Sequence, residues 1–484
     1  MMLEQAAAAT RFYHVHAAIS LAINPAVVRS YDIRGRVGDQ LSLKDARALG
    51  LAYATVARSQ RKRHIAVGRD GRLTSFDLEG ALIEGLVAGG MRVRRLGVGP
   101  TPELYFAVCV GQLDGGVMVT GSHNPPDQNG FKLVLSGEPV CGHALHRMVA
   151  IPGTSALGGS VCDLALPGEA TAGQAYVERL AGMGAQAPPL HAIWDCGNGA
   201  VGAVIGELTA RLPGRHTLLN DAVDGRFPAH HPDPSVADNL RQLQAAVLEK
   251  RADLGIAFDG DGDRIGVVDS SGAIVWPDQL LLLLAIDALR SRKGAAIVGD
   301  VKSSRVLFDE VERHGGRAVM APSGYVRVRA CMLREKAPLA GEMSGHIFHS
   351  DCWHSTDDAL FVAIRMLLAL GRRGGSLADF RQSLPVTAAT PELRLPCPED
   401  RKEAVINEVS ARLEASERVR IDRTDGLRVT TEDGWWLLRA SGTEPKLTAR
   451  CEAPDAAALE RLQRTLAIQL GYSGIACRQE RELC

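Results

Sequence analysis

Three segments of this chain share one pattern, in which a short apolar run leads into a polar loop with glycine and then into a stretch of helical periodicity. Short strands that alternate with helices in this way are typical of βαβ units, whose strands pair largely in parallel. Each segment stands at the head of a block of domain size. The pattern therefore predicts three related α/β domains with mixed, largely parallel sheets, and their opening strands are expected at 64–67, 191–195 and 295–298.

The pattern changes after about residue 386. The proline-rich stretch 391–398 predicts a linker. A charged helix over 399–417, strands that end near Arg439 and a last helix from about Ala456 then predict a smaller α+β module. The expected divisions are an N-terminal extension over 1–24, α/β domains over 25–168, 169–273 and 274–385, and a C-terminal α+β domain over 386–484.

Composition limits the classes of partner. The 484 residues are too many for one hydrophobic core, in agreement with several domains. Lysine and arginine (55) nearly balance aspartate and glutamate (56), so the net charge favours neither nucleic acid nor a membrane surface. The longest apolar stretch, 280–289, contains Asp287 and is too short to cross a bilayer. Ten cysteines without metal-ligand spacing indicate reduced thiols. We therefore expect a cytoplasmic protein with no nucleic-acid and no membrane partner.

Ser122 is the first candidate for chemistry. The apolar run 115–119 predicts a buried strand, and the glycine, asparagine and prolines after it place Ser122 on a loop at the strand end. Reacting groups of α/β enzymes lie at such strand ends. The imidazole of His123 and the ammonium of Lys132 suit nucleophilic or phosphoryl-carrying chemistry. A hydrogen-bonded polar turn without catalytic function is the alternative interpretation.

Asp259, Asp261 and Asp263 form the second candidate, separated by glycines that let the backbone fold around one point. At about 5 Å and an effective dielectric near 20, each pair of carboxylates would repel by roughly 3 kcal/mol. A divalent cation removes that repulsion, and oxygen ligands favour Mg²⁺ or Ca²⁺. The EF-hand pattern does not fit, since Arg264 stands at its sixth position and Ser270 at its twelfth. A solvated acidic turn is the alternative.

Two later loops could bind a phosphorylated sugar. Glu342 and Ser344, two residues apart on a glycine-flanked turn, could exchange hydrogen bonds with sugar hydroxyls. Arg439, the Ser441 and Thr443 hydroxyls and the backbone around Gly442 would make a phosphate cradle. Taken singly, each loop is equally well explained as ordinary turn chemistry.

Together with the segment 29–35, these four motifs appear in order and at domain-sized spacings, and the chain resembles the α-D-phosphohexomutase family, most closely its phosphomannomutase/phosphoglucomutase branch. The resemblance extends from about Asn24 to the C-terminus. It implies three related α/β domains and a smaller fourth around a central cleft. It also implies that Ser122 carries a phosphoryl group and contacts Mg²⁺, with Asp259, Asp261 and Asp263 as the other metal ligands.

The resemblance assigns further roles. Arg264 would steady the transferring phosphate, and Lys132 and His123 would handle protons. Other matching positions are expected to contact substrate or to surround the serine. These positions are Tyr31, Arg34, Asn124, Lys302, Ser323, Gly324, Tyr325, Glu342, Ser344, His346, Arg439, Ser441, Gly442 and Thr443.

Two positions depart from the pattern of close relatives. Tyr325 stands where many have histidine, and Gln279 stands where arginine is common. Neither touches the serine or the metal motif, so we expect any effect to fall on sugar preference or affinity.

The implied activity is reversible phosphoryl transfer between the 1 and 6 positions of mannose and/or glucose phosphates, through a phosphoserine and a 1,6-bisphosphate intermediate. Mg²⁺ would be required, glucose or mannose 1,6-bisphosphate would be the activator, and the enzyme would be a monomer or weak dimer. Glucosamine phosphate is the rival substrate, although Gly121 and Met343 favour mannose and glucose. A serine-dependent sugar phosphatase and a non-catalytic sugar-phosphate binder are alternatives from other classes.

Overall fold

The computed structural model describes residues 23–163, 171–350, 353–414, 419–442 and 445–475. The chain divides into two compact units. The first unit holds residues up to 275 together with 345–377, and the second unit holds 276–344 together with 378–484. In the parts of the chain that the structure describes, no helix is long and apolar enough to cross a membrane. Most of the expected N-terminal extension, residues 1–22, lies outside the described residues, whereas Ile23 already belongs to the first hydrophobic core.

The first unit begins with a mixed sheet of strand order β1-β5-β4-β2-β3-β7, with β6 paired to β5. The pairs β2–β3, β2–β4 and β3–β7 are parallel, and β5 runs antiparallel to its neighbours. Its strands are β1 (Ile33–Arg36), β2 (His64–Arg69), β3 (Arg92–Val98), β4 (Gly115–Val119), β5 (Gln128–Leu135), β6 (Glu138–Pro139) and β7 (Ser160–Asp163). The helices of this part are η1 (Pro25–Val27), α1 (Leu43–Ser59), α2 (Ser75–Ala88), α3 (Thr101–Val110) and α4 (Gly142–Ala150).

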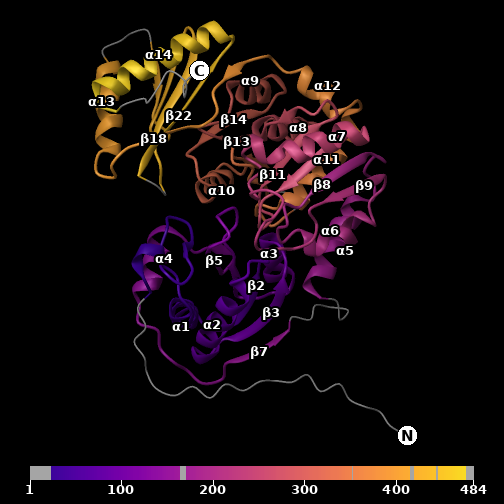
Figure 1. Cartoon of the computed structure of the whole chain (residues 1–484), viewed down its shortest axis with the longest axis vertical. Coiled ribbons are helices and arrows are strands. Elements are labelled where there is room, and N and C mark those ends of the chain that lie inside the picture. The colour runs from indigo at the N-terminus through magenta and orange to yellow at the C-terminus, as the bar shows by residue number, and fades with distance from the viewer. Residues whose placement is uncertain (1–22, 164–170, 351–352, 415–418, 443–444, 476–484) are drawn as a thin grey trace. The chain divides into compact units, whose positions relative to one another are not determined.

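Both faces of this sheet are buried, because helices pack on each (Figure 1). Alternate residues of a strand point to opposite faces. Ile65 and Val67 of β2 accordingly join the large core under α1 and α2. Ala66, between them, packs instead with Met118 and Leu104 beneath α3. A continuous apolar strand is what burial on two faces requires.

A second sheet follows, in the order β12-β11-β10-β8-β9. Strands β8, β9 and β10 are parallel, and β10 turns back antiparallel into β11. Helix α11 packs against α5 and β11. The strands are β8 (His191–Asp195), β9 (Arg215–Leu219), β10 (Leu254–Phe258), β11 (Ile265–Asp269) and β12 (Ile274–Val275), and the first unit also contains β16 (Ile347–His349), α5 (Ala172–Gly184), α6 (Gly202–Thr209), η2 (Ala237–Leu240), α7 (Arg241–Lys250) and α11 (Ala359–Arg373).

The second unit combines a parallel α/β part with an antiparallel sheet. In the α/β part β13 pairs in parallel with β14 and β15. The elements of this part are α8 (Pro277–Leu289), β13 (Ala296–Asp300), α9 (Arg305–Arg313), β14 (Arg317–Ala321), α10 (Tyr325–Arg334) and β15 (Leu339–Gly341). Helix α12 (Leu377–Gln382) precedes the antiparallel sheet.

The C-terminal sheet has the order β17-β22-β21-β20-β19, with β18 paired to β22, and its strands pair antiparallel. Its core lies beneath α13 and α14 on one face (Figure 1). The elements are β17 (Ala388–Ala389), β18 (Leu393–Pro396), α13 (Lys402–Glu414), β19 (Arg420–Asp422), β20 (Leu427–Thr431), β21 (Gly434–Ala440), β22 (Lys446–Ala453) and α14 (Ala456–Tyr472).

The predicted linker over 391–398 is wrong in part, because β18 lies within it. Leu393 and Leu395 are buried whereas Arg394 and Pro396 are exposed, which is the alternation of a half-buried strand. Proline is tolerated at the end of such a strand, where its missing N–H costs little. The predicted fold class is otherwise confirmed: three α/β domains are followed by an antiparallel C-terminal domain with two helices.

Candidate active site

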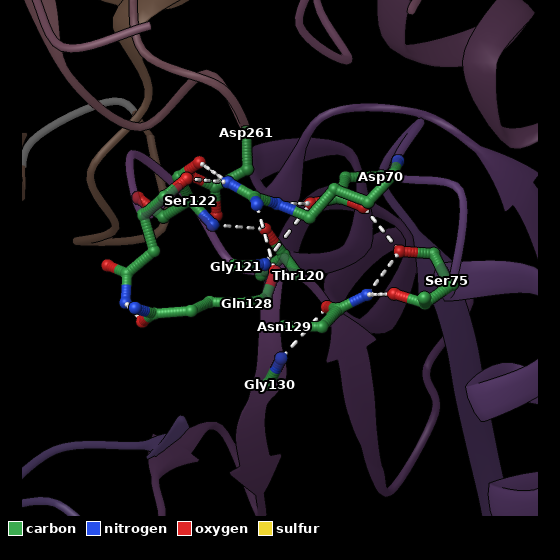
Figure 2. Close-up of polar contacts among 12 residues, drawn as sticks. Asp70, Ser75, Thr120, Gly121, Ser122, Gln128, Asn129, Gly130 and Asp261 are labelled. Atoms are coloured by element: carbon green, nitrogen blue, oxygen red, sulfur yellow. Dashed lines mark hydrogen bonds and ion pairs between the residues drawn. The ribbon is translucent and has the colours of Figure 1, made fainter. Parts of the chain in front are cut away.

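Ser122 lies on a tight loop after β4 and is almost fully buried. Its φ of 48° is in the left-handed region, which costs a residue with a side chain about 1 kcal/mol or more. The backbone N–H of Ser122 donates to Thr120 Oγ1 at 2.8 Å (Figure 2). Its Oγ donates to Asp259 Oδ2 at 2.7 Å and lies 3.1 Å from His123 Nδ1. The predicted strand-end position of the serine is confirmed, and the loop turns its hydroxyl toward the acidic motif.

Arg72 holds this loop in shape. Its guanidinium donates to the backbone carbonyls of Ser122, Asn124 and Pro125, each at 2.6 Å, and of Gln128 at 2.9 Å. The arginine side chain is fully buried. Four carbonyls of one loop converge on a single planar cation, and the loop therefore has little freedom to move.

Asp70 links Arg72 to the sheet. Its carboxylate lies 3.2 Å from Arg72 Nε and accepts from the N–H of Gly121 at 3.2 Å and from Ser75 Oγ at 2.5 Å. Ser75 in turn accepts from the Asn129 amide of β5 (Figure 2). A Cβ at Gly121 would lie 2.6 Å from the Arg72 guanidinium carbon, so the glycine makes room for the arginine.

Asp259, Asp261 and Asp263 are buried together on the loop between β10 and β11, and each offers an oxygen within 4.8 Å of the others. Within the described residues, Asp261 Oδ1 and Asp263 Oδ1 are buried without a hydrogen-bond partner. Their second oxygens accept from Lys132 Nζ, at 2.7 Å in the case of Asp261. Unpaired carboxylate oxygens in a closed site fit a hard divalent cation, so this group could hold a metal ion.

Burial and mutual repulsion dominate the titration of this group. Burial, with repulsion from Asp261 and Asp263, raises the pKa of Asp259 well above its usual range. Burial opposes ionisation of Asp261 as well, but Lys132 prevails and lowers the pKa of Asp261. Burial also disfavours a charged Lys132, yet the two carboxylates raise the pKa of Lys132 well above its usual value. Lys132 is thus a cation at neutral pH, which favours charge balance over the proton handling that the family resemblance implies for it.

His123 has the opposite character. Burial, reinforced by the charges of Arg264 and Arg34, lowers the pKa of His123 well below its usual value. The imidazole is therefore neutral at pH 7 and has a lone pair available. Arg34 donates through Nη1 to the carbonyl of Gly121 and to Asn124 Oδ1, and through Nε to Asp32.

Thr101, the first residue of α3, anchors one of the acids. Its Oγ1 donates to Asp261 Oδ2 at 2.5 Å, and its N–H donates to the Asp261 carbonyl at 2.8 Å. A helix N-terminus carries partial positive charge and favours a carboxylate. The first helical turn of α3 thus fixes the direction of Asp261.

His346 lies beside the metal motif in the first unit. Arg264 Nε donates to His346 Nε2 at 3.0 Å, and His346 Nδ1 lies 2.7 Å from Asp357 Oδ2. The same Nδ1 is 3.7 Å from Asp263 Oδ1. The predicted sugar contact His346 is therefore also tied to the loop that carries Arg264, and its ring lies beside the Asp357 carboxylate.

The second unit gathers the predicted sugar contacts. Ser344 Oγ and the N–H of Gly324 donate to the two oxygens of Glu342, at 2.9 and 3.2 Å. Lys302 Nζ is 3.9 Å from Glu342 Oε1 and 3.3 Å from Glu392 Oε2. The sequence predictions thus fall into two groups, one in each unit: the serine and acids in the first, and Glu342, Ser344, Lys302 and the loop 323–325 in the second.

Arg439 lies on β21 of the C-terminal sheet, and its Nε donates to Asp425 Oδ2 at 2.8 Å. The carbonyl of Ser441 accepts from Lys402 Nζ at 2.6 Å. Gly442 follows at the end of the described segment, and Thr443 lies outside the described residues. The Arg439 guanidinium is therefore held by Asp425 at Nε, and its Nη1 makes a longer contact of 3.5 Å with Thr448 Oγ1.

The two departures noted in the sequence have structural counterparts. Tyr325 is the first residue of α10, directly after Gly324, whose φ of 117° suits glycine. Gln279 Oε1 accepts from the N–H of Trp276 at 3.1 Å, which caps the first turn of α8. Gln279 thus has a helix-capping role in this chain.

Sequence reasoning missed several residues of the site. Asp70, Arg72, Thr101 and Asp425 form hydrogen bonds with predicted site residues, with their backbone or with the loop of Ser122, and Asp357 Oδ2 lies 2.7 Å from His346 Nδ1. A signal existed for Asp70 and Arg72, since they stand on a glycine-containing loop directly after β2. No local pattern marks the other three.

Glu103, in the first turn of α3, offers a test of how this region responds to pH. Burial raises the pKa of Glu103 to about 8, from a usual value of 4.5. The folded protein therefore binds a proton that the unfolded chain releases, so this contribution is complete below pH 4.5 and is lost as pH rises through 8. The loss is about 1.4 kcal/mol per pH unit within that window.

Glu103→Gln removes the ionisable group. We expect the variant to match the wild type in urea unfolding near pH 4.5 and to exceed it by several kcal/mol, at about 1.4 per pH unit, near pH 8. If the variant and the wild type have the same free energy of unfolding near pH 4.5 and also near pH 8, Glu103 is not buried in a protonated form.

Comparison with known proteins agrees with this geometry. Models of the phosphoglucomutase/phosphomannomutase α/β/α domains I, II and III match residues 26–147, 174–272 and 276–387, and the model of the C-terminal domain matches 392–469. The phosphomannomutase/phosphoglucomutase of Pseudomonas aeruginosa is 40% identical over 448 residues, which cover 92% of this chain and 95% of that protein. The phosphoglucomutase of Neisseria gonorrhoeae is 40% identical over 444 residues, covering 90% and 95%.

Among solved structures, a phosphoglucomutase/phosphomannomutase family protein from Burkholderia thailandensis has a TM-score of 0.85 at 37% identity, covering 93% of this chain and 98% of that one. These matches, over nearly the whole chain, define an enzyme of the phosphosugar-handling class. More narrowly, the chain belongs to the phosphoglucomutase/phosphomannomutase family.

Proposed function

We propose that this enzyme moves a phosphoryl group reversibly between the 1 and 6 positions of mannose and/or glucose phosphates, with Ser122 as the phosphoryl carrier. The observation that supports this most strongly is the 2.7 Å contact between Ser122 Oγ and Asp259, inside a buried cluster of three carboxylates. A polar turn without catalytic function has no need to bury a serine hydroxyl beside carboxylates. This arrangement suits a phosphoserine, because a cation held by the carboxylates would balance the charge of the phosphoryl group.

The metal expected at this cluster is Mg²⁺. Asp259, Asp261, Asp263 and the serine oxygen would hold it, because only oxygen ligands are present and two of the carboxylate oxygens are unpaired within the described residues. When bound, the metal supplies positive charge that lowers the cost of concentrating charge on the transferring phosphoryl group.

The chain's own residues account for the remaining requirements of the first step. The bond between phosphorus and Ser122 Oγ breaks while a bond to the sugar hydroxyl oxygen forms, and the hydroxyl proton must leave. His123 is suited to take that proton, because burial keeps it neutral. Lys132 stays charged and balances phosphoryl charge together with Arg264. His123 Nδ1 lies 3.1 Å from Ser122 Oγ and can pass the same proton to the serine oxygen as its bond to phosphorus breaks. The product is a sugar 1,6-bisphosphate and a free Ser122 hydroxyl, with His123 neutral again.

The second step reverses the first at the other end of the sugar. The bisphosphate reorients, its other phosphoryl group returns to Ser122, and the proton returns to the new hydroxyl. Glu342 and Ser344 would bind sugar hydroxyls, and Arg439, Ser441, Gly442 and Thr443 would bind the phosphate that is not being transferred. Lys302 and the loop 323–325 complete the substrate contacts, and Tyr31, Arg34 and Asn124 support the serine loop.

A coupled assay tests the proposal. The full chain is supplied with Mg²⁺, a trace of glucose 1,6-bisphosphate, and glucose 1-phosphate, mannose 1-phosphate or glucosamine 6-phosphate in separate reactions. Isomer formation from the first two is expected. Preference for the amino sugar would favour a glucosamine phosphate mutase, and release of inorganic phosphate without isomer would indicate a phosphatase. The requirement for bisphosphate activator, the state of monomer or weak dimer and the cytoplasmic location stay predictions.

A further inference from the structure

We propose that Asp425 is a positioning residue that couples the phosphate-binding Arg439 to the sugar-binding loop 323–325. The inference rests on the proposed function, because it takes Arg439 and this loop as substrate contacts. Asp425 stands in the turn between β19 and β20 and belongs to none of the motifs that the sequence singles out. All of the groups involved lie in the second unit.

One carboxylate oxygen of Asp425 serves both elements. Asp425 Oδ2 accepts from Arg439 Nε at 2.8 Å and from the backbone N–H of Ser323 at 3.1 Å. The side chains of Arg439 and Asp425 are 12% and 14% exposed, so the pair is only slightly screened by solvent. Because the two donors share a single acceptor, a displacement of the guanidinium is felt at the loop.

The arginine end of this link is geometrically defined. Asp425 binds Nε, so neither terminal nitrogen of the guanidinium is used by this carboxylate, and Nη1 makes only a 3.5 Å contact with Thr448 Oγ1. A phosphate is bound well by such a pair of terminal nitrogens. Gly426, which follows Asp425, has a φ of 75°, and a Cβ there would lie 2.4 Å from the Leu438 carbonyl. The backbone of the turn can therefore approach β21 closely, and this brings Asp425 beside Arg439.

The loop end of the link reaches the sugar contacts. Ser323 Oγ donates to Asp300 Oδ2 at 3.1 Å, and the next residue, Gly324, donates its N–H to Glu342 Oε2 at 3.2 Å. Ser344 donates to the other oxygen of Glu342. A chain of hydrogen bonds thus runs from Arg439 through Asp425 and the loop to the carboxylate expected to read sugar hydroxyls. Phosphate binding and sugar orientation share one network.

The test separates coupling from simple support of Arg439. Binding of glucose 1-phosphate and of inorganic phosphate is measured by calorimetry on the full chain and on Asp425→Ala, Arg439→Ala and the double variant. If Asp425 acts only by holding Arg439, the double variant will match Arg439→Ala for both ligands. Coupling to the loop predicts a further loss of at least about fivefold for glucose 1-phosphate in the double variant, the value of about one hydrogen bond. The affinity for inorganic phosphate should then stay within about twofold of that of Arg439→Ala.

Matched variants keep the result interpretable. Asp425→Val has no acceptor oxygen and fills more of the site than alanine, and it is read in the same way if Asp425→Ala fails to fold. Arg327→Ala removes only the exposed partner 3.5 Å from Asp425 Oδ1 and should leave both affinities unchanged. Equal affinities of the double variant and Arg439→Ala for glucose 1-phosphate would overturn the coupling. Absence of isomer formation by the wild type, with the extra loss still present, would count against the proposed function alone.

Discussion

Ser122→Ala is expected to lower the rate of sugar-phosphate isomerisation by at least about 10⁴-fold, because the variant has no oxygen to carry the phosphoryl group. The loss should fall on kcat, since the substrate contacts of the second unit are untouched. Intact-mass measurement checks the cause directly. After incubation with glucose 1,6-bisphosphate the wild type should gain about 80 Da, the mass of one phosphoryl group, and the variant should gain nothing.

Two controls distinguish lost chemistry from lost structure. Ser291→Ala changes an exposed serine at the end of α8 and should keep full activity and the mass gain. Calorimetric titration with Mg²⁺ should still show binding to Ser122→Ala, since Asp259, Asp261 and Asp263 remain. A Ser122→Ala protein that still gains a phosphoryl group, or that keeps a tenth of the activity, would show that another residue is the carrier.

Much of the fold follows from patterns that are local in sequence. The strands predicted at 115–119 and 191–195 are short runs followed by turn residues, and the structure has both at those residues. The strand Leu393–Pro396 is missed because the prolines in and around it indicate a linker. Its pairing with β22 depends on residues about fifty positions away, which no local pattern reveals.

The site divides in the same way. Ser122 and the three aspartates carry their signal in adjacent residues, since a hydroxyl at a strand end and spaced carboxylates have few other uses. The residues that hold these side chains in place have no such signal in the adjacent sequence. Arg72 reaches the serine loop because β2 and β4 are parallel neighbours, with Arg69 opposite Val119, and this places both following loops at one edge of the sheet. The sequence of β2 or of β4 alone does not predict that the two strands are neighbours in the sheet.

After Ser122, Arg72 is the residue whose substitution should reduce the rate of isomerisation most. Its four carbonyl contacts are charge-assisted hydrogen bonds in a buried place, and each such bond contributes roughly 1.5–3 kcal/mol. Without them the carbonyls lose their donors, and the left-handed conformation of Ser122 loses its support. The hydroxyl would then no longer be held 2.7 Å from Asp259. A displacement of about 1 Å at a reacting atom can reduce the rate by 10²-fold.

We therefore expect Arg72→Met to lower kcat by about 10²- to 10³-fold, and Arg72→Lys to recover little, because an ammonium has three donors and lacks the planar fork. KM for glucose 1-phosphate should change little, since the residues expected to bind the sugar and its fixed phosphate do not contact Arg72. Arg241→Met is the matched control, as Arg241 is exposed and pairs with the exposed Asp238. The rate of phosphoryl uptake from glucose 1,6-bisphosphate, followed by intact mass, should fall in step with kcat. If Arg72→Met lowers the melting temperature but takes up phosphoryl as fast as the wild type, the arginine stabilises the fold without positioning the serine.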